Sequence, residues 1–456
     1  MCMNNNLNEK GDLKLPALLL MGGGLFSMHF GASSMVWPMN WGKESGTSVW
    51  IAFCGVFITA LLLTLLAYVA LARGEGTYSK ITNRVLGNKL GAVYTIVTII
   101  VLGPLYAIPR MSAASWDSVI QAFSLNYETK LPLIIFTVLF YLVTYWFLMN
   151  PGKTMDRISQ LLFPFLIIIV IVVVGKGLIT PIAEPVAKSY KGSAFAYGFT
   201  NGYATAEILC ALIFGVVIIN GLKSKGVPEE RMSKNVIRVG IIGVGLLSCT
   251  HLCHMLIGAS TGGTIDLTYT ALYTAVATKL LGSLGGILFS IALFFAALTT
   301  AIGMTSGCAE FFVDITQGKI DYKKASIAIL VLSTLFGCMG LASILELLGP
   351  ILDGIYPAAI VLVIYYALMP NSQNARHLNV CRYAMITALV FGIFDMVHTY
   401  GIKLNINLGY FNTFYDSLPL SSDMLAWFPW TVAAAIIGYL VFPKNKAAVG
   451  KNIKEI

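Results

Sequence analysis

The sequence predicts an all-α polytopic membrane protein, on the evidence of its hydrophobic composition, its few charges and its long apolar runs. Of the 456 residues, 57% are hydrophobic and 11% are charged, whereas soluble globular proteins have about 25% charged residues. Lipid offers no hydrogen-bond partner to a bare backbone, so spanning segments are helices or closed barrels. The apolar runs reach the roughly 20 residues that a helical span needs. They also lack the period of two that barrel strands show, so we expect helices.

Twelve apolar runs divide the chain, and residues 1–456 are expected to form a single transmembrane domain. The runs cover 15–41, 47–72, 91–123, 131–150, 158–180, 194–222, 236–260, 269–309, 324–341, 343–369, 380–401 and 424–442. Only Gly337 and Gly340 mark the joint between the ninth and tenth runs. The polar connections are all short, so we expect function to lie within the membrane.

The placement of lysine and arginine predicts the orientation of these spans. If the N-terminus is cytoplasmic, the cytoplasmic loops carry 22 of these residues and the outer loops 7, with Arg110 inside the third run. Cytoplasmic loops are enriched in both residue types, so both termini are expected in the cytoplasm. The net charge of +9 then reflects orientation and not nucleic-acid binding. The N-terminal residues also lack the pattern of a removable signal peptide.

Two of the runs are interrupted, and they lie five runs apart. The first contains FGASS and the sixth contains YGFTNGYATAE. Broken helices in matching positions indicate a secondary transporter with an inverted repeat. We therefore expect residues 15–180 to form one repeat, 194–369 a second, inverted copy, and 380–442 two further helices. The alternative is that these small residues only allow close helix packing.

A break at mid-membrane exposes groups that suit a zwitterion. Carbonyls at the end of the first half-helix favour a cation, and amides at the start of the second favour a carboxylate. In the first run, we expect the carbonyls near Ser27 and Phe30 to face a cation. We expect the amides of Ala32, Ser33 and Ser34 to face a carboxylate.

The eighth run contains two adjacent hydroxyls, on Thr299 and Thr300. Together with carbonyls of a broken helix, they could form a sodium site without any carboxylate. The alternative is that each hydroxyl bonds back to the carbonyl four residues earlier, as membrane threonines commonly do.

Ionisable groups inside spans are costly and are functional candidates by default. Arg110 either attracts a substrate carboxylate or pairs with Asp117 or Glu207. Glu207 is either that partner or a proton site. His29, beside the first break, either titrates near neutral pH or is a hydrogen-bonded packing residue. No nucleotide-binding loop or hydrolytic motif is found, so we expect neither an enzyme nor a cofactor, and energy must come from an ion gradient.

The chain resembles one known family in four stretches, HFGASSMVWPMNWGKESGTSVW, LGPLYAIPR, NGYATAEILCALIFGVVIINGLKSKGV and LTTAIGMTSGCAEFF. They are similar to the first, third, sixth and eighth spans of the branched-chain amino-acid:cation symporters, the bacterial system II carriers of leucine, isoleucine and valine. The resemblance covers most of the chain in order. The family belongs to the amino-acid/polyamine/organocation superfamily, whose fold is like that of the bacterial leucine transporter.

The resemblance implies two sets of site residues. The Na⁺ ligands would be the carbonyls of Ser27, Phe30 and Ala296 and the hydroxyls of Thr299 and Thr300. The substrate would lie against Ala32, Ser33, Ser34, Tyr197, Gly198, Thr200, Gly202 and Tyr203, with Tyr203 as a wall of the side-chain pocket. The chain departs from the family's Gly-Ala-Gly-Asn at Ser33 and Ser34, and it has Glu207 where the family has Asp.

Together these features predict a multi-pass transporter of the bacterial plasma membrane. We expect it to import neutral, branched aliphatic amino acids by Na⁺ symport through alternating access. The alternative within transporters is H⁺ coupling with another small neutral amino acid as substrate. The alternative of another class is a non-transporting amino-acid sensor. The preferred amino acid and the oligomeric state stay open.

Overall fold

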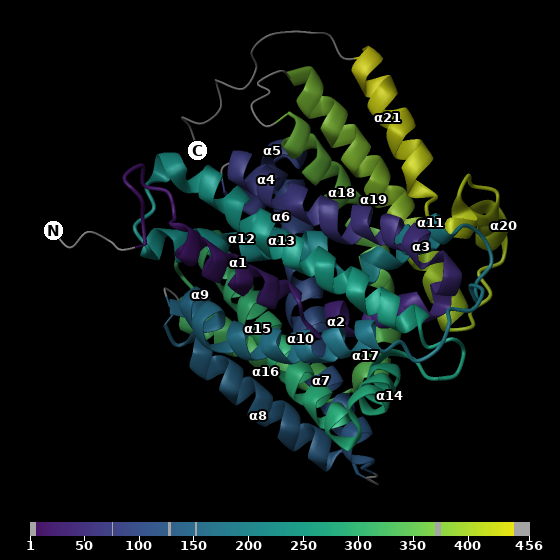
Figure 1. Cartoon of the computed structure of the whole chain (residues 1–456). Helices are drawn as coiled ribbons and strands as arrows, with labels where there is room; N and C mark the ends of the chain where they lie inside the picture. Colours follow the sequence, from purple (N-terminus) through teal and green to yellow (C-terminus); the bar gives the residue numbers. More distant parts are fainter. Residues whose placement is uncertain (1–5, 75, 126–128, 151–152, 370–374, 442–456) are drawn as a thin grey trace.

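The computed structural model of the chain describes residues 6–74, 76–125, 129–150, 153–369 and 375–441, and this part is almost entirely helical, as predicted (Figure 1). The helices of its first half are α1 (Leu15–His29), α2 (Ala32–Ser45), α3 (Val49–Val56), α4 (Leu63–Arg73), α5 (Tyr78–Leu86), α6 (Asn88–Ile100), α7 (Ile108–Phe123), α8 (Leu131–Leu148), α9 (Thr154–Arg157) and α10 (Phe163–Ile179). Those of its second half are α11 (Ala194–Asn201), α12 (Glu207–Ser224), α13 (Glu229–Ala259), α14 (Tyr269–Leu281), α15 (Ser283–Ile315), α16 (Tyr322–Gly337), α17 (Leu341–Leu347), α18 (Pro350–Leu368), α19 (Ala375–Lys403), α20 (Tyr410–Asp416) and α21 (Trp427–Val441).

Three spans contain π-helical stretches, which the apolar pattern does not reveal. These are η2 (Phe57–Leu62), η3 (Val101–Ala107) and η5 (Ile158–Leu162). Pro104 lies inside η3, where its missing N–H removes a helical hydrogen bond. Wider turns of this kind often occur at functional sites.

Among the described residues, nine helical stretches are long and apolar enough to cross a membrane. The number is ten if the bent pair α16 and α17 counts as one span, while α1 and α21 are shorter apolar helices. One of the nine is the stretch 32–73, although Gly46 interrupts it with a φ of +48°. The polytopic helical architecture is therefore confirmed, and the number twelve stays a prediction.

Two of the predicted boundaries are wrong. The run 269–309 is two helices, because Gly282 adopts a φ of +69° between α14 and α15. The tenth run is predicted to begin at residue 343, but its long helix, α18, begins at Pro350. Before it, the chain turns by 102° after α16 and forms the short helix α17. Apolar residues continue through both turns, so hydropathy alone does not mark them.

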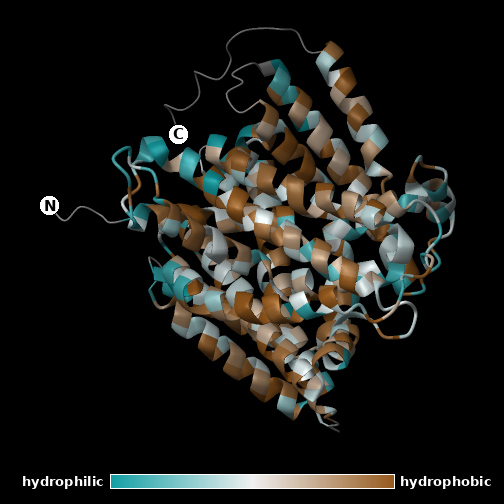
Figure 2. Cartoon of the chain, viewed as in Figure 1, coloured by the Kyte–Doolittle hydropathy of each residue, from teal (hydrophilic) through white to brown (hydrophobic). Residues whose placement is uncertain are grey.

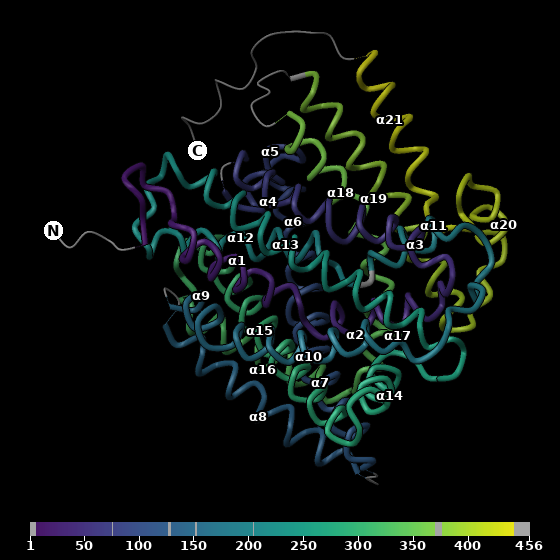
Figure 3. The backbone as a smooth tube through the Cα atoms, in the orientation of Figure 1, coloured from purple at the N-terminus to yellow at the C-terminus, as the bar shows by residue number. Residues whose placement is uncertain are grey.

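The centre of the bundle is made by α1, α2, α12, α13 and α15, which pack on one another. The spanning parts of α12 and α15 are mostly buried, whereas those of α8, α10 and α19 are mostly exposed. Hydrophobic residues follow the helices, and hydrophilic residues gather in the connections at their ends (Figure 2). At one side, α18, α19 and α21 lie next to one another (Figure 3). Phe30 and Ala206, the residues at the two helix breaks, are fully buried in this arrangement.

Candidate functional site

The first predicted break is present between α1 and α2. Phe30 and Gly31 leave the helix, with ψ angles of 59° and −169°. A Cβ atom on Gly31 would lie 2.4 Å from the Thr300 hydroxyl oxygen, so the break packs tightly against α15. Ala32, Ser33 and Ser34 form the first turn of α2 and are buried. Their amides therefore belong to the turn in which a helix supplies no carbonyl acceptor.

The second break lies at the end of the YGFTNGYATAE stretch. The helix α11 ends at Asn201, and a 3₁₀ turn, η6 (Gly202–Thr205), follows. Ala206 adopts a left-handed φ of 57°, and α12 begins at Glu207. Glu207 therefore lies in the first turn of α12, where a negative charge is favoured by the helix dipole.

A buried hydrogen-bond network joins the two breaks. The Glu207 carboxylate binds the Nδ1 atom of His29 and accepts a hydrogen bond from the Ser34 hydroxyl. The other ring nitrogen of His29 lies 2.7 Å from the Tyr68 hydroxyl. The exposed fractions of His29, Ser34 and Glu207 are 3%, 2% and 1%. Residues that the sequence marks separately thus form one contact between α1, α2 and α12.

Oxygen atoms gather where α1 meets α15. The Thr299 hydroxyl lies 2.6 Å from the Ser27 carbonyl oxygen and 2.9 Å from that of Ala296. Three of the five predicted Na⁺ ligands are therefore in contact. The Thr299 hydroxyl has only one proton to donate, whereas its own oxygen and the two carbonyl oxygens each have two lone pairs. The cluster therefore has lone pairs left over that can coordinate a cation.

The remaining predicted ligands lie close by. The Thr300 hydroxyl donates to the carbonyl of Met28 at 2.7 Å, and Phe30 lies at the break itself. Both threonines thus reach across to α1, in addition to the local bond from Thr299 to Ala296. The broken end of α1 is held to α15 by these two hydroxyls.

Three predicted substrate residues of α11 and η6 face other partners. A Cβ atom on Gly198 would lie 1.8 Å from the carbonyl oxygen of Ala52, and one on Gly202 would lie 2.1 Å from the Thr59 hydroxyl. These glycines therefore pack against the second span. The Tyr197 hydroxyl donates to Glu44, and its ring stacks on Tyr190 with centroids 3.8 Å apart. A direct role in substrate binding stays a prediction for all three.

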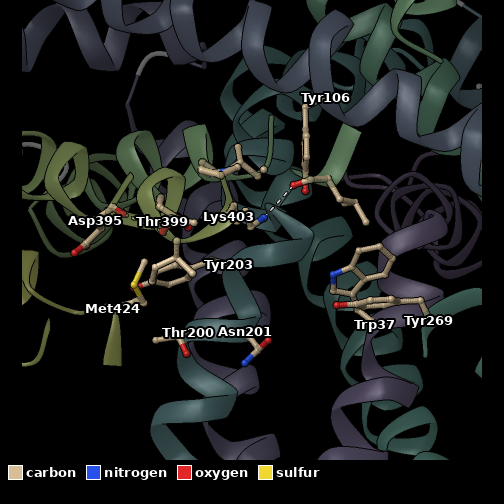
Figure 4. A pocket seen from close by; sticks show the side chains of 16 residues that line it. Trp37, Tyr106, Thr200, Asn201, Tyr203, Tyr269, Asp395, Thr399, Lys403 and Met424 are labelled. Atoms are coloured by element: carbon tan, nitrogen blue, oxygen red, sulfur yellow. Dashed lines mark hydrogen bonds between the residues drawn. The ribbon is translucent and has the colours of Figure 1, made fainter. Parts of the chain in front are cut away.

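Thr200 and Tyr203 line a cavity of about 460 Å³ (Figure 4). The other lining residues come from several elements, and they include Trp37, Tyr106, Asn201, Tyr269, Leu345, Gly349, Pro350, Leu352, Asp353, Asp395, Thr399, Ile402, Lys403 and Met424. Sequence reasoning missed the polar group on α19. Its signal is a spacing of four residues between Asp395, Thr399 and Lys403, which puts them on one helix face.

Arg110 is buried behind one wall of this cavity. Its guanidinium donates to the Tyr106 hydroxyl at 2.7 Å. It also lies over the rings of Tyr106 and Trp37, at 4.3 and 5.6 Å from their centroids. Arginine binds aromatic faces favourably when it is desolvated. The Arg110 guanidinium therefore contacts two residues that line the cavity, Tyr106 and Trp37.

Comparison with known proteins connects this geometry to one family. Residues 15–445 match the family described as branched-chain amino acid transport protein. The branched-chain amino acid permease BraB of Bacillus subtilis is 31% identical over 438 residues, covering 95% of this chain and 97% of the permease. The branched-chain amino acid transport system 2 carrier protein of Pseudomonas aeruginosa is 31% identical over 415 residues, covering 90% of this chain and 92% of the carrier.

A solved structure shows the same fold. The transporter Mhp1 of the nucleobase-cation-symport-1 family, in a closed conformation with bromovinylhydantoin bound, matches with a TM-score of 0.56. The match covers 94% of each chain at 14% identity, so it bears on the fold alone. The fold is leucine-transporter-like, as the resemblance implies. By its match over residues 15–445, the chain belongs to the branched-chain amino acid transport protein family, whose members are carriers and not enzymes.

Proposed function

We propose that the chain is a secondary active transporter that imports leucine, isoleucine or valine together with Na⁺ by alternating access. Membership of the family supports the substrate class, since relatives are named branched-chain amino acid permease and carrier. The observation that carries Na⁺ coupling is the Thr299 hydroxyl, which lies between the carbonyls of Ser27 and Ala296. Ser27 lies in the last turn of α1, and carbonyls at such half-helix ends coordinate Na⁺ in transporters with broken helices.

In this proposal the ion and the substrate use the two ends of the first break. Na⁺ binds the carbonyl end of α1 and holds it against α15. The amides of Ala32, Ser33 and Ser34 then bind the substrate carboxylate at the start of α2. Thr200 and Tyr203 contribute from the cavity side, while Tyr197, Gly198 and Gly202 position α11. Binding of Na⁺ favours the arrangement that binds the substrate, and this is the basis of symport.

Uptake into proteoliposomes tests this coupling. With an imposed inward Na⁺ gradient, we expect labelled leucine to accumulate, and we expect Thr299→Ala to weaken the apparent Na⁺ affinity by about tenfold or more. Thr299→Ser keeps the hydroxyl and should retain most of the affinity. Thr305→Ala, a buried threonine six residues along α15, is the matched control. Unchanged Na⁺ affinity in Thr299→Ala would refute the site, and saturable binding without flux would indicate a sensor.

H⁺ coupling is the second candidate, and the His29–Glu207 contact favours it. Buried carboxylates and histidines inside membrane spans are typical members of proton pathways in transporters, and this pair lies at the junction of three helices. If H⁺ is the coupling ion, an imposed pH gradient drives uptake without Na⁺. Glu207→Gln then loses this response while it retains exchange of labelled for unlabelled substrate. Uptake that follows only the Na⁺ gradient in both proteins excludes H⁺ coupling.

We further propose twelve spans with both termini in the cytoplasm of a bacterial cell. The first ten spans form the inverted repeat of 15–180 and 194–369, and 380–442 supply two more. The excess of lysine and arginine in the assigned cytoplasmic loops supports this topology, as do the bacterial sources of the relatives.

A further inference from the structure

A second cavity of about 460 Å³ lies between α18, α19 and α21, the helices at one side of the bundle (Figure 1). We call it the α21 groove. Its floor contains the buried residues Leu63, Ile360 and Cys381. Its rim contains Leu368 and Val432, which are 72% and 41% exposed. Because α18 and α19 are long and apolar enough to cross a membrane, the open side of the groove faces lipid.

The walls of the groove are mostly aliphatic and aromatic. The hydroxyl of Thr431, on the α21 side, donates to the carbonyl oxygen of Trp427 at 2.7 Å and is therefore already satisfied. The side chains of His377 and Tyr439 lie together at one end, with ring centroids 6.3 Å apart. Apolar surface of this kind excludes water and favours hydrocarbon, so the occupant must be mainly apolar.

The length of the groove indicates the shape of this occupant. Trp427 and Tyr439 both line it, and at 1.5 Å per residue they lie about 18 Å apart along α21. The hydrocarbon of one leaflet, half of a core of roughly 30 Å, is about 15 Å thick. An acyl chain of a membrane lipid can therefore extend along the whole groove, whereas a compact solute would leave most of it unfilled.

A positive charge marks one end of the groove. The Arg376 guanidinium lies over the Tyr439 ring, 3.9 Å from its centroid, and donates to the Tyr439 carbonyl oxygen. The sequence has no aspartate or glutamate in 354–394 or in 424–441, so these parts of the three helices supply no carboxylate to offset the charge. Guanidinium groups bind phosphate well, and basic sites between membrane helices bind anionic lipid head groups.

A second copy of the chain is the other apolar partner that could cover the groove. A twofold dimer brings the same surface of both copies together. Contact through the α21 groove would place the two Arg376 side chains at the same depth in one interface, without a carboxylate from these helices between them. The charge therefore favours an anionic lipid over a second copy.

We propose that the α21 groove binds one anionic phospholipid. An acyl chain lies along α21 between Trp427 and Tyr439, and the phosphate binds at Arg376 and His377. In the topology proposed above, this lipid belongs to the cytoplasmic leaflet. Phe199 of α11 also lines the groove, so the acyl chain contacts the first half of the broken sixth span. The proposal does not depend on which substrate or coupling ion is transported.

Lipid binding to the purified full-length protein tests this site. Delipidated protein in detergent is titrated with phosphatidylglycerol or phosphatidylcholine of identical acyl chains, and bound lipids are counted by native mass spectrometry. One phosphatidylglycerol should bind about tenfold more tightly than phosphatidylcholine, as expected for one hydrogen bond to a charged group. Arg376→Gln should remove this preference and leave phosphatidylcholine binding unchanged. Ala435→Phe, at a lining position, should displace both lipids.

Two controls match these variants. Lys89→Gln removes an exposed cation at the start of α6, outside the groove lining. Ile437→Phe adds a ring to α21 at a position that is 60% exposed and does not line the groove. Neither should change lipid binding. The proposal is overturned if the wild type binds both lipids equally, if Arg376→Gln keeps the preference, or if Ala435→Phe retains the lipid. A dimer that dissociates in Ala435→Phe and persists in Ile437→Phe would assign the groove to a second copy instead.

Discussion

At the scale of single residues, two neighbouring serines at the start of α2 have opposite surroundings. The Ser34 hydroxyl donates to the Glu207 carboxylate. The Ser33 hydroxyl is buried and makes no hydrogen bond to another described residue. Both occupy positions where the sequence is expected to depart from the pattern of its family. The Ser34 hydroxyl thus has a partner on the second broken helix, the carboxylate of Glu207.

This difference predicts unequal effects of the same substitution. Ser34→Ala should cost about 1.5–3 kcal/mol of stability, because a hydrogen bond to a charged group is lost in a buried setting. Ser33→Ala should be neutral or slightly stabilising, because it removes a buried hydroxyl without breaking a bond. Unfolding of the two variants in the same detergent measures both. Equal losses would mean that the Ser34–Glu207 contact contributes nothing to stability.

At the scale of elements, α11 packs closely against the second span because the glycines at this contact have no side chains. Gly55 and Gly198 face each other's helices closely, since a Cβ atom on Gly55 would lie 2.3 Å from the carbonyl oxygen of Phe195. The Thr59 hydroxyl also donates to the carbonyl of Phe199 at 2.8 Å. Small residues allow such close approach between membrane helices. Close helix packing, the alternative explanation for the small residues of the interrupted runs, thus accounts for the glycine Gly198 of the sixth span.

Gly198→Ala should separate α11 from α3. The added methyl group would meet backbone atoms of Ala52, which cannot move away as a flexible side chain would. Overpacking of this kind costs about 1–3 kcal/mol, and it should reduce leucine uptake by displacing Thr200 and Tyr203. Gly245→Ala on α13, where nothing lies within 4 Å, is the control. Thermal unfolding and uptake with wild-type values for Gly198→Ala would contradict this packing.

The helix breaks could be predicted, whereas the faces of the broken helices could not. Glycine and hydroxyl residues inside apolar runs mark Gly31 and the 3₁₀ turn at Gly202–Thr205 directly. The rotation of α11 about its axis depends on contacts with α3, so the sequence did not reveal that Gly198 faces this helix. The pairing of His29 with Glu207 likewise joins residues 178 positions apart. The cavity residues of α19 have a periodic signal in the sequence, the spacing of four residues between Asp395, Thr399 and Lys403.

At the scale of the whole molecule, the number of crossings depends on α14. The predicted run 269–309 counts α14 and α15 as one span, and the turn at Gly282 separates them. With 13 residues, α14 is about 20 Å long at 1.5 Å per residue, which is shorter than the roughly 30 Å hydrocarbon core. We therefore expect α14 to lie at the membrane surface. Three crossings then separate the loop before α11 from the loop after α15.

Cysteine labelling on intact cells tests this count and the orientation together. Lys188, which is half-buried, and Lys319, which is exposed, lie in these two loops. A membrane-impermeant maleimide should label Lys188→Cys in intact cells and Lys319→Cys only after permeabilisation. Labelling of the unsubstituted chain measures the contribution of its own cysteines. Equal labelling of both variants after permeabilisation is the control. If α14 crosses the membrane, the two positions lie on the same side and label alike. If Lys319→Cys alone is labelled in intact cells, the orientation is the reverse of that predicted by the lysine and arginine distribution.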